Sequence, residues 1–363
     1  MRLFQNSGIY PAYLPRLNRL AADARTFEQR RHVFLADRYG ACHFLKPVLD
    51  ASPDAFFTNG DDERLQQLWA REQGMVANAA AADILLGQIE HHRSEVFYNL
   101  DPMRFGADFL KRLPGHVKVS LCWRAAPSAG GDFRGYRRVL GNFPGILRSY
   151  ESAGLPSAYF APAHDPAMDR YGVRTDRPID VLFVGGYSRH HQRRATILEA
   201  VAELHARNKL VYCLDRSRLT RLAETPAGLL PPLRKHRRPK AIRAVSQDPV
   251  FGLDLYDLLS KSKIVLNAAI DMAGEDRGNM RCFEAMGCGA LMVSDNGRYP
   301  DGMNAGETFL DYDTPAAAKT IVLRALSSPG LIASVAASGH RLIRERYSKE
   351  SQWTSFLRIV EQI

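Results

Sequence analysis

The sequence predicts an α/β fold made of two doubly wound domains, and three observations favour this class. The chain has 363 residues, which is long for one ordinary core and comfortable for two domains. Strand-like and helix-like segments alternate in both halves, as they do in parallel sheets with helices on both faces. A segment rich in Pro, Asp and Gly, residues 162–178, lies between the halves and has no periodicity, so we interpret it as a hinge.

The first half predicts a domain at residues 1–165. Apolar residues recur at helical spacing in 27–40 and over most of 62–92. Three short apolar runs are typical of buried strands: 95–100, 117–123 and 157–163.

The second half repeats the alternation more clearly and predicts a domain at residues 166–345. An apolar strand, 179–187, ends in Gly-Gly and precedes a basic helix, 189–208. Ligands of open parallel sheets bind beyond the carboxyl ends of the strands, so we expect a site in a cleft between the two domains. Further strands are expected at 209–215, 263–269, 290–295 and 308–313. Further helices are expected at 255–262, 315–328, 330–347 and 348–363.

Composition limits the possible partners and compartments. The net charge is +10 and the pI is about 9.4, which favours nucleotides, nucleic acid or acidic membrane surfaces as partners. Five cysteines are scattered without a CxxC pair, which is typical of a reducing compartment without disulfides or zinc. Because no apolar run approaches the length of a membrane span, we expect a cytoplasmic protein, with peripheral contact at the inner membrane face left open.

The turn after the first strand of the second half is a candidate phosphate site. Gly185 and Gly186 allow close approach of the backbone to a ligand, and the following helix offers its N-terminus. Arg189, Arg193 and Arg194 lie within about two turns of that terminus and carry the charge that a pyrophosphate needs. A tight turn followed by a solvated basic helix face explains the same residues, since the full GxGxxG fingerprint is absent.

The segment "DRGNMRCFEAMGCGALMVSD", residues 276–295, is the more specific candidate. A helix beginning near Gly278 or Asn279 would place Asp276 in the preceding loop and Glu284 about two turns along. Both carboxylates would then converge on one cleft, where they could accept hydrogen bonds from sugar hydroxyls. Asp276 alone fits a helix cap, whereas Glu284 lies in an apolar stretch where a carboxylate needs a partner.

The same residues resemble a known family. "RCFEAMGCGALMVSD" is similar to the nucleotide-binding signature of GT-B glycosyltransferases, and the Asp276-x7-Glu284 spacing resembles the Glu-x7-Glu motif of many retaining members. "IDVLFVGGYSRHHQRR", "PVFGLDLYDLLSKSKIVLN" and "GETFLDYDTPAAA" look like other parts of such a C-terminal domain. The chain is most similar to the spore-maturation-protein-like branch, which has an arginine shortly before "FEA". The resemblance is specific over about residues 179–315.

The resemblance implies a role for each candidate residue. Glu284 would bind the donor ribose, while Arg281, with the backbone of Gly278 and Asn279, would contact phosphate or the transferred sugar. Asp276 replaces the first Glu of the motif, which leaves its sugar-binding role and the stereochemistry open; Asp276 and Arg281 are the candidate catalytic residues. Two further sets follow from the resemblance. The pyrophosphate would face Arg189 and Arg193 or Arg194. The base would lie against the backbone of Val250 to Gly252, near Tyr256.

The predicted function is therefore sugar transfer from a nucleotide-sugar donor. The acceptor, a glycan, a lipid-linked group or another molecule, would bind the first domain, and the final segment, 346–363, would pack back toward that domain, as in similar proteins. Synthesis of surface polysaccharide or glycoconjugates is the expected setting. Two alternatives remain: a nucleotide-sugar epimerase on the same fold, and a basic binding protein without catalysis.

No metal or other cofactor is expected. GT-B enzymes stabilise the leaving group with arginine and helix dipoles, and "DYD", 311–313, fits a polar turn better than a metal motif. The run "RKHRRPKAIR", 234–243, has six Lys or Arg in ten residues and could attract anionic lipid, although a solvated loop is the simpler interpretation. Nucleic acid is not an expected partner because no aromatic residues interleave with these charges. His164 and Asp165, in the hinge, are further candidates for the cleft.

Overall fold

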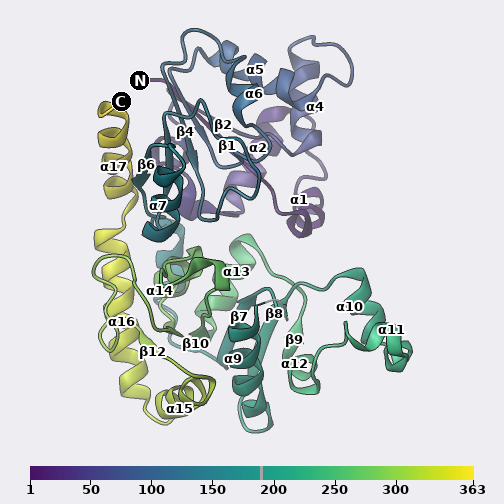
Figure 1. Cartoon of the computed structure of the whole chain (residues 1–363), viewed down its shortest axis with the longest axis vertical. Helices are drawn as coiled ribbons and strands as arrows, with labels where there is room; N and C mark the ends of the chain where they lie inside the picture. Colours follow the sequence, from purple (N-terminus) through teal and green to yellow (C-terminus); the bar gives the residue numbers. More distant parts are fainter. Residues whose placement is uncertain (189–190) are drawn as a thin grey trace. The chain divides into compact units, whose positions relative to one another are not determined.

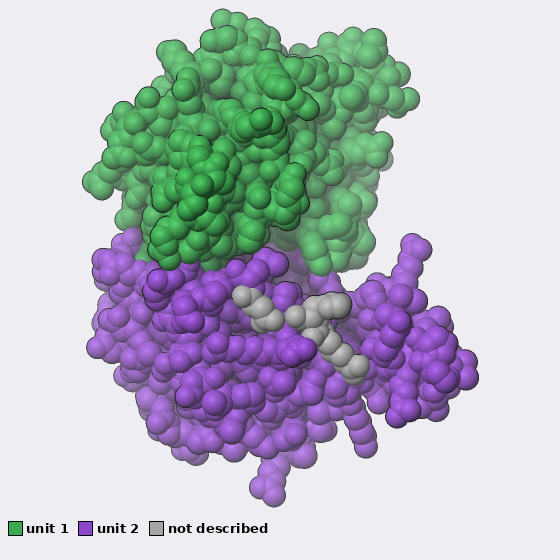
Figure 2. Space-filling view, viewed as in Figure 1, with its two compact units in different colours: residues 1–163, 347–363 green, residues 164–346 purple. Residues whose placement is uncertain are grey.

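The computed structural model describes residues 1–188 and 191–363 (Figure 1). The chain divides into two compact units, shown in different colours in Figure 2. Unit 1 consists of residues 1–163 and 347–363, and unit 2 of residues 164–346. Each unit contains one parallel sheet with helices packed on it, which is the predicted α/β class.

Unit 1 is built on a six-stranded parallel sheet in the order β2-β1-β3-β4-β5-β6. Its strands are β1 Leu3–Ser7, β2 Ala55–Asn59, β3 Val96–Asn99, β4 Val119–Trp123, β5 Arg138–Gly141 and β6 Ser157–Tyr159. Its helices are α1 Leu14–Leu20, α2 Phe27–Ala36, α3 Lys46–Leu49, α4 Glu63–Glu72, α5 Ala81–His92, α6 Ala107–Leu110, α7 Pro144–Ser152 and α17 Lys349–Glu361, with 3₁₀ turns η1 Pro11–Tyr13 and η2 Ala41–His43.

Three strands of unit 1, β1, β2 and β5, were not predicted. β1 was missed because three of its five buried residues are polar, so its sequence lacks the apolar run typical of a buried strand. Gln5 donates to the carbonyl of His43 at 3.0 Å, and Asn6 donates to Asn99 Oδ1 at 2.8 Å. Buried polar groups need such partners, so these residues fix the strand as firmly as apolar ones would.

The last helix, α17, packs within unit 1 through a buried lysine. Lys349 donates from Nζ to the carbonyls of Ala41 and Phe44, both at 2.7 Å, and also to the carbonyl of Cys42. The ammonium group thereby satisfies carbonyls at the end of η2, a position that a cation stabilises.

Unit 2 contains, within the described residues, a six-stranded parallel sheet in the order β12-β11-β10-β7-β8-β9. Its strands are β7 Ile179–Gly185, β8 Leu210–Leu214, β9 Ser246–Gln247, β10 Ser262–Leu266, β11 Leu291–Asp295 and β12 Leu310–Tyr312. Its helices are α8 Asp169–Gly172, α9 Gln192–Ala202, α10 Arg218–Ala223, α11 Pro231–Arg234, α12 Lys240–Val245, α13 Gly252–Ser260, α14 Met280–Gly287, α15 Pro315–Leu326 and α16 Pro329–Arg346. Its 3₁₀ turns are η3 Pro166–Met168, η4 Glu203–Ala206, η5 Pro226–Leu229 and η6 Asp271–Ala273.

The core of unit 2 lies between the sheet and the helices on its faces. Val181 of β7, Ile264 of β10 and Leu291 of β11 belong to one buried apolar cluster, which Leu198 of α9 and Val322 of α15 also join. Each of these strands contains at least three consecutive apolar residues, as expected for strands covered on both faces, which explains why the sequence located them.

Two segments that we expected to be irregular, 162–178 and 234–243, contain helical structure. The hinge segment 162–178 contains η3 and α8, and most of it belongs to unit 2. The basic run 234–243 was expected to be a loop, but it includes the end of α11 and the start of α12.

No single helix in the described part of the chain is long and apolar enough to cross a membrane. Helices α15 and α16 together meet the length and composition criteria, with a bend of 104° between them.

Candidate functional site

The strand order of the unit 2 sheet reverses at β7. β8 lies on one side of β7 and β10 on the other, and all three strands run in the same direction. Doubly wound sheets bind ligands beyond the carboxyl ends of the strands at such a reversal. β7 ends at Gly185 and β10 at Leu266, so the loops that begin at Gly186 and Asn267 border the candidate site.

Arg194 of α9 holds these two loops together. Its guanidinium donates to the carbonyl of Ala268 at 2.9 Å and to the carbonyl of Gly186 at 3.4 Å. The resemblance implied that Arg193 or Arg194 faces the pyrophosphate, and the structure gives Arg194 this positioning role. Arg193 is exposed and donates to Asn296 Oδ1, beyond β11, at 3.0 Å. Arg189 lies outside the described residues.

Helix α14 begins at the same edge of the sheet. Its N-cap is Asn279, close to the predicted start near Gly278 or Asn279, yet the Asn279 side chain makes no capping hydrogen bond to the helix. Gly278, just before it, has a φ of 116°, a conformation that side chains with a Cβ rarely adopt. The first N–H groups of a helix have no partner within that helix. The positive end of α14 is therefore turned to the carboxyl edge without a side-chain cap.

A buried polar network, not predicted from the sequence, holds Asn279 in place. Asn279 donates to Asn267 Oδ1 at 3.0 Å, and Asn267 donates to Ser294 Oγ at 3.0 Å. The hydroxyl of Tyr299 donates to Ser294 Oγ at 2.7 Å. Asn267 and Ser294 lie at the ends of the apolar runs "KIVLN" and "LMVSD", so polar residues ending buried strands were the signal that could have revealed them.

Arg277 and Asp295 form a second unpredicted part of this edge. The two side chains are buried and lie 2.9 Å apart, and Asp295 also accepts from the N–H of Ala269 at 3.1 Å. Buried charges persist only when paired in this way. The pair ties the loop before α14 to the end of β11 and to the loop after β10.

Asp276 lies in the loop before α14, where the sequence placed it, but its side chain is buried and paired. Arg298 contacts Asp276 Oδ1 from Nη2 at 2.8 Å and from Nε at 3.0 Å. The backbones of the two loops also pair, since the N–H of Arg277 donates to the carbonyl of Arg298 at 2.8 Å. The expected open carboxylate is thus part of an ion pair, with a partner 22 residues away in sequence that the motif does not contain.

Glu284 is buried on α14 and is paired with Arg281, one turn earlier. Arg281 Nη1 donates to Glu284 Oε2 at 2.7 Å. Burial raises the pKa of Glu284, the charge of Arg281 opposes this shift, and the nearby carboxylate of Asp165 adds to it. The sequence therefore identified a carboxylate in an unusual environment, and the structure supplies the cationic partner that its burial requires.

Residues 164–168 lie beneath α14 within unit 2. Asp165 is buried and accepts from the hydroxyl of Tyr256 at 3.2 Å. His164 is also buried and contacts Asp169 Oδ1 through Nε2 at 2.9 Å, and burial lowers its pKa. A Cβ on Gly287 of α14 would lie 2.4 Å from Met168 Sδ. Close packing of α14 on this segment thus depends on a glycine.

The expected base-binding segment is only partly accessible. Gly252 begins α13 with a φ of 61° and is buried, and Val250 is half-buried. Tyr256 was expected beside the base, but its ring is buried, with its centroid 6.0 Å from that of Tyr171. Tyr256 supports Asp165 and has no open face for stacking.

The structure therefore brings one subset of the predicted residues to the carboxyl edge of unit 2. Gly186, Arg193, Arg194 and the N-terminus of α14 border the reversal point through the contacts described above. Asp276 and Glu284 are each paired with a different arginine, and no described contact joins these two carboxylates.

Unit 1 has its own strand reversal, at β1, and two carboxylates lie beside it. Asp61 follows β2 and accepts from the N–H of Ile9 at 2.9 Å through Oδ2. Its buried Oδ1 has no hydrogen-bond partner among the described residues. Asp101 follows β3 and lies next to Gly8, where an added Cβ would be 3.5 Å from the Asp101 Cβ. Burial raises the pKa of Asp61 to about 6, and Asp101 contributes to the shift.

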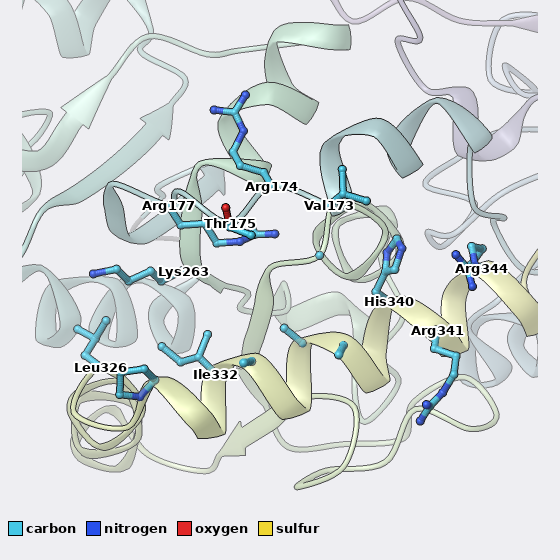
Figure 3. A pocket seen from close by; sticks show the side chains of 16 residues that line it. Val173, Arg174, Thr175, Arg177, Lys263, Leu326, Ile332, His340, Arg341 and Arg344 are labelled. Carbon is cyan, nitrogen blue, oxygen red and sulfur yellow. The ribbon is translucent and has the colours of Figure 1, made fainter.

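A cavity of about 670 Å³ in unit 2 lies elsewhere. It is lined by Arg177, just before β7, by Lys263 near the start of β10, and by Ile332 and His340 of α16 (Figure 3). Arg177 and Lys263 lie at the amino ends of these strands, opposite to the carboxyl edge. Of the predicted site residues that the structure describes, none lines this cavity.

Among the described residues, no group of three or more His, Cys, Asp or Glu side chains could hold a metal ion. Asp311 lies within β12, and Asp313 is exposed next to Thr314, which caps α15. The "DYD" segment thus ends a strand and precedes a helix.

Comparison with known proteins identifies the domain. Residues 189–358 match a family described as glycosyl transferase-like. HepE of Anabaena, crystallised with UDP, superposes with a TM-score of 0.59 at 10% identity, with 100% of each chain covered. The chain has the GT-B fold, and residues 189–358 match a glycosyltransferase-like family. Sucrose-phosphate synthase of Thermosynechococcus elongatus gives a TM-score of 0.55 at 13% identity, covering 100% of this chain and 99% of the other. AviGT4, a glycosyltransferase of avilamycin A biosynthesis, gives 0.55 at 15%, covering 100% and 97%. No curated protein matches the sequence.

The match to a glycosyltransferase-like family allows a comparison of the carboxyl edge of unit 2 with the needs of sugar transfer. Sugar transfer from a nucleotide-sugar needs a site for a diphosphate. The carboxyl edge of unit 2 contains the N-terminus of α14 and the side chains of Arg193 and Arg194. The GT-B fold predicted from the sequence is confirmed.

Proposed function

We propose that this glycosyltransferase takes its sugar from a UDP-sugar that binds the carboxyl edge of unit 2. The proposal rests on one observation above all: the N-terminus of α14 has no side-chain cap, and its N-cap Asn279 is bonded to Asn267 at the end of β10, beside the strand reversal. HepE, which has the same fold, was crystallised with UDP-glucose. That likeness makes UDP the first nucleotide to test.

The diphosphate of the donor would lie on the N–H groups at the start of α14. A helix N-terminus and guanidinium groups stabilise negative charge, and charge develops on the diphosphate as the glycosidic bond breaks. Of the described arginines named at this edge, Arg193 and Arg298 have exposed side chains. Arg194 and the Asn267 network would hold the loops and the helix in position, so that little reorganisation is needed during the reaction.

Glu284 would bind the ribose hydroxyls. Oε2 accepts from Arg281 in the free protein, so ribose would add hydrogen bonds to the carboxylate while Arg281 keeps its charge balanced. The raised pKa of Glu284 means that the group is held in an environment that penalises its charge. A donor of hydrogen bonds relieves that penalty.

The acceptor hydroxyl would bind unit 1 beside Asp61. Its buried Oδ1, which has no partner among the described residues, can accept a hydrogen bond, and a pKa of about 6 suits proton transfer near neutral pH. If transfer inverts the anomeric centre, Asp61 is the base; if transfer retains it, Asp61 only orients the hydroxyl. The acceptor classes named from the sequence, a glycan or a lipid-linked group in surface glycoconjugate synthesis, remain part of this proposal.

Thermal stabilisation by nucleotides tests the donor site. We expect UDP to raise the melting temperature more than GDP, CMP or dTDP do, because a ligand that binds only the folded state stabilises it. The variant Arg193→Ala should reduce the UDP shift, whereas Arg207→Ala, an exposed arginine of the same unit, should not. Absence of stabilisation by every nucleotide would reject the proposal. Conversion of the donor alone to an isomer would favour an epimerase instead.

A further inference from the structure

Residues 216–245, here called the basic lobe, form an insertion between β8 and β9 of unit 2. The lobe contains α10, η5, α11 and α12. In Figure 1, α10 and α11 stand out from the sheet of unit 2 on its right side. None of the residues predicted for the donor site lies in this insertion.

The basic lobe carries most of the net charge of the protein. Residues 216–243 include nine Lys or Arg and one acidic residue, Glu224, a net charge of +8 out of +10 for the whole chain. The rest of the chain is thus close to neutral. A charge concentrated in so short a segment favours an anionic partner at this place.

The basic lobe also exposes large apolar side chains. Among the described residues, six leucines have exposed side chains, and four of these six lie in one stretch of the lobe, residues 219–230. Their exposed fractions are 50% for Leu219, 48% for Leu222, 74% for Leu229 and 59% for Leu230. Scattered exposed leucines need no explanation, but a local group of them beside a basic surface marks an interaction site.

The only acidic residue of the charged segment serves the inside of the lobe. Glu224 binds Arg238, which is buried, through two hydrogen bonds of 2.5 and 2.9 Å. Arg237 donates to the carbonyls of Ala223 and Thr225 at 2.6 and 2.8 Å. Arg237 and Arg238 therefore connect the end of α10 to the residues after α11. Because Glu224 is used in this way, residues 216–243 have no other carboxylate to neutralise the surface of the lobe.

A hollow of about 540 Å³ lies in this surface, and its lining contains no acidic residue. Five of its seven lining residues are cationic, and the other two are Pro231 and Pro239. Such a hollow offers room for a phosphate group. The cations that line it are Arg234, Lys235, Arg237, Arg238 and Arg243.

We propose that the basic lobe docks on an anionic lipid bilayer. The leucines of α10 and of the η5–α11 turn would enter the interface between head groups and acyl chains, and the hollow would hold lipid phosphate. Nucleic acid fits less well, because residues 216–245 contain no Phe, Tyr or Trp for stacking and a polyanion leaves the exposed leucines without a role. The occupant that uses both the charge and the leucines is a membrane surface.

Flotation with vesicles tests the proposal on the full chain. We expect binding to vesicles that contain phosphatidylglycerol and little binding to pure phosphatidylcholine. Arg234→Glu with Lys235→Glu, and separately Leu229→Ser with Leu230→Ser, should each weaken binding by about tenfold. The control for the charge change is Arg207→Glu with Arg324→Glu, two exposed arginines of unit 2. The control for the leucine change is Val76→Ser in unit 1, where Val76 is 77% exposed. The controls should bind as the wild type does.

A single-site label gives a second readout. All five native cysteines are buried, so Leu229→Cys introduces an accessible thiol for an environment-sensitive dye. The dye emission should shift to the blue with anionic vesicles and stay unchanged for a dye on Val76→Cys. Equal binding to neutral vesicles, no binding to anionic ones, or binding that the leucine changes do not affect would overturn the proposal. Salt-sensitive binding to heparin that the leucine changes leave intact, without vesicle binding, would identify a soluble polyanion instead.

Discussion

Arg281 and Glu284 form an ion pair of 2.7 Å across one turn of α14, with side-chain exposures of 14% and 3%. The pair lies on the helix whose N-terminus faces the carboxyl edge of unit 2. Because one member is almost sealed from water, neither charge can be removed without consequence for the other. This relationship links the stability of α14 to the proposed binding of the donor ribose.

Replacing Glu284 tests both sides of that link. Glu284→Ala should lower the free energy of unfolding by about 3 kcal/mol, because it leaves Arg281 without its partner in a largely buried position. It should also abolish stabilisation by UDP. The double variant Arg281→Ala/Glu284→Ala should lose less stability than the sum of the single variants, as expected for coupled residues. Chemical denaturation measures the stabilities, and an additive result would contradict the coupling.

A substitution at Gly186 should affect UDP affinity without lowering the stability of the fold. An added Cβ there has no heavy atom of the described residues within 4 Å, and the φ of Gly186 is not in the left-handed region. We therefore expect Gly186→Ala to keep or slightly raise the melting temperature, since alanine restricts the unfolded chain. If the backbone at Gly186 approaches the donor, the same change should raise the Kd for UDP at least several-fold. Unchanged affinity in calorimetric titration would remove Gly186 from the donor site.

Asp61 predicts a pH dependence with a defined sign. Its folded pKa of about 6 lies above its usual value of 3.8, so the fold favours the protonated carboxyl. This contribution to stability is complete below pH 3.8 and is lost as the pH rises through about 6. As the pH rises from 3.8 to about 6, the free energy of unfolding of the wild type should fall relative to that of Asp61→Asn.

If Asp61 acts as a base, kcat/KM should rise through the same pH range, and Asp61→Asn should remove most of the activity. Asp101→Asn should move the rise to lower pH, because Asp101 helps to raise the pKa of Asp61. A profile that Asp101→Asn does not shift would contradict this role. The anomeric configuration of the product, determined by NMR, then distinguishes a base from a residue that orients the hydroxyl.

Chelation tests the proposal that arginine and the helix terminus replace a metal at the diphosphate. Turnover of a UDP-sugar should be unchanged in EDTA and should not rise on addition of Mg²⁺ or Mn²⁺. Arg193→Ala should lower kcat in either condition. Complete loss of turnover in EDTA, restored by Mn²⁺, would show that a metal carries the charge of the leaving group.

The sequence predicted those parts of the fold in which local pattern and burial agree. β7, β10 and β11 are apolar runs, and Asn279 precedes an amphipathic helix, so their positions could be read directly. β1 was not found because Gln5 and Asn6 are buried polar residues whose partners lie 38 to 93 residues away. Such partners are set by strand order, which a local pattern does not contain.

The candidate site was predicted by residue type more reliably than by environment. Glu284 and Asp276 were identified, but the arginine that neutralises Asp276 lies in the loop after β11. Tyr256 was expected at a base because aromatic rings stack on bases, whereas its hydroxyl binds buried Asp165. Whether a side chain faces a ligand or the core depends on tertiary packing, and that information is not in the spacing of the motif.

Hydrogen exchange measured by mass spectrometry, with and without UDP, tests most directly the claim that the donor binds the carboxyl edge of unit 2. We expect slower exchange in peptides that cover residues 278–284, at the start of α14, and in those around Gly186. A control with the variant Arg193→Ala should show weaker protection at equal UDP concentration. Protection confined to the cavity beside α16 or to unit 1, with residues 278–284 unchanged, would contradict the account.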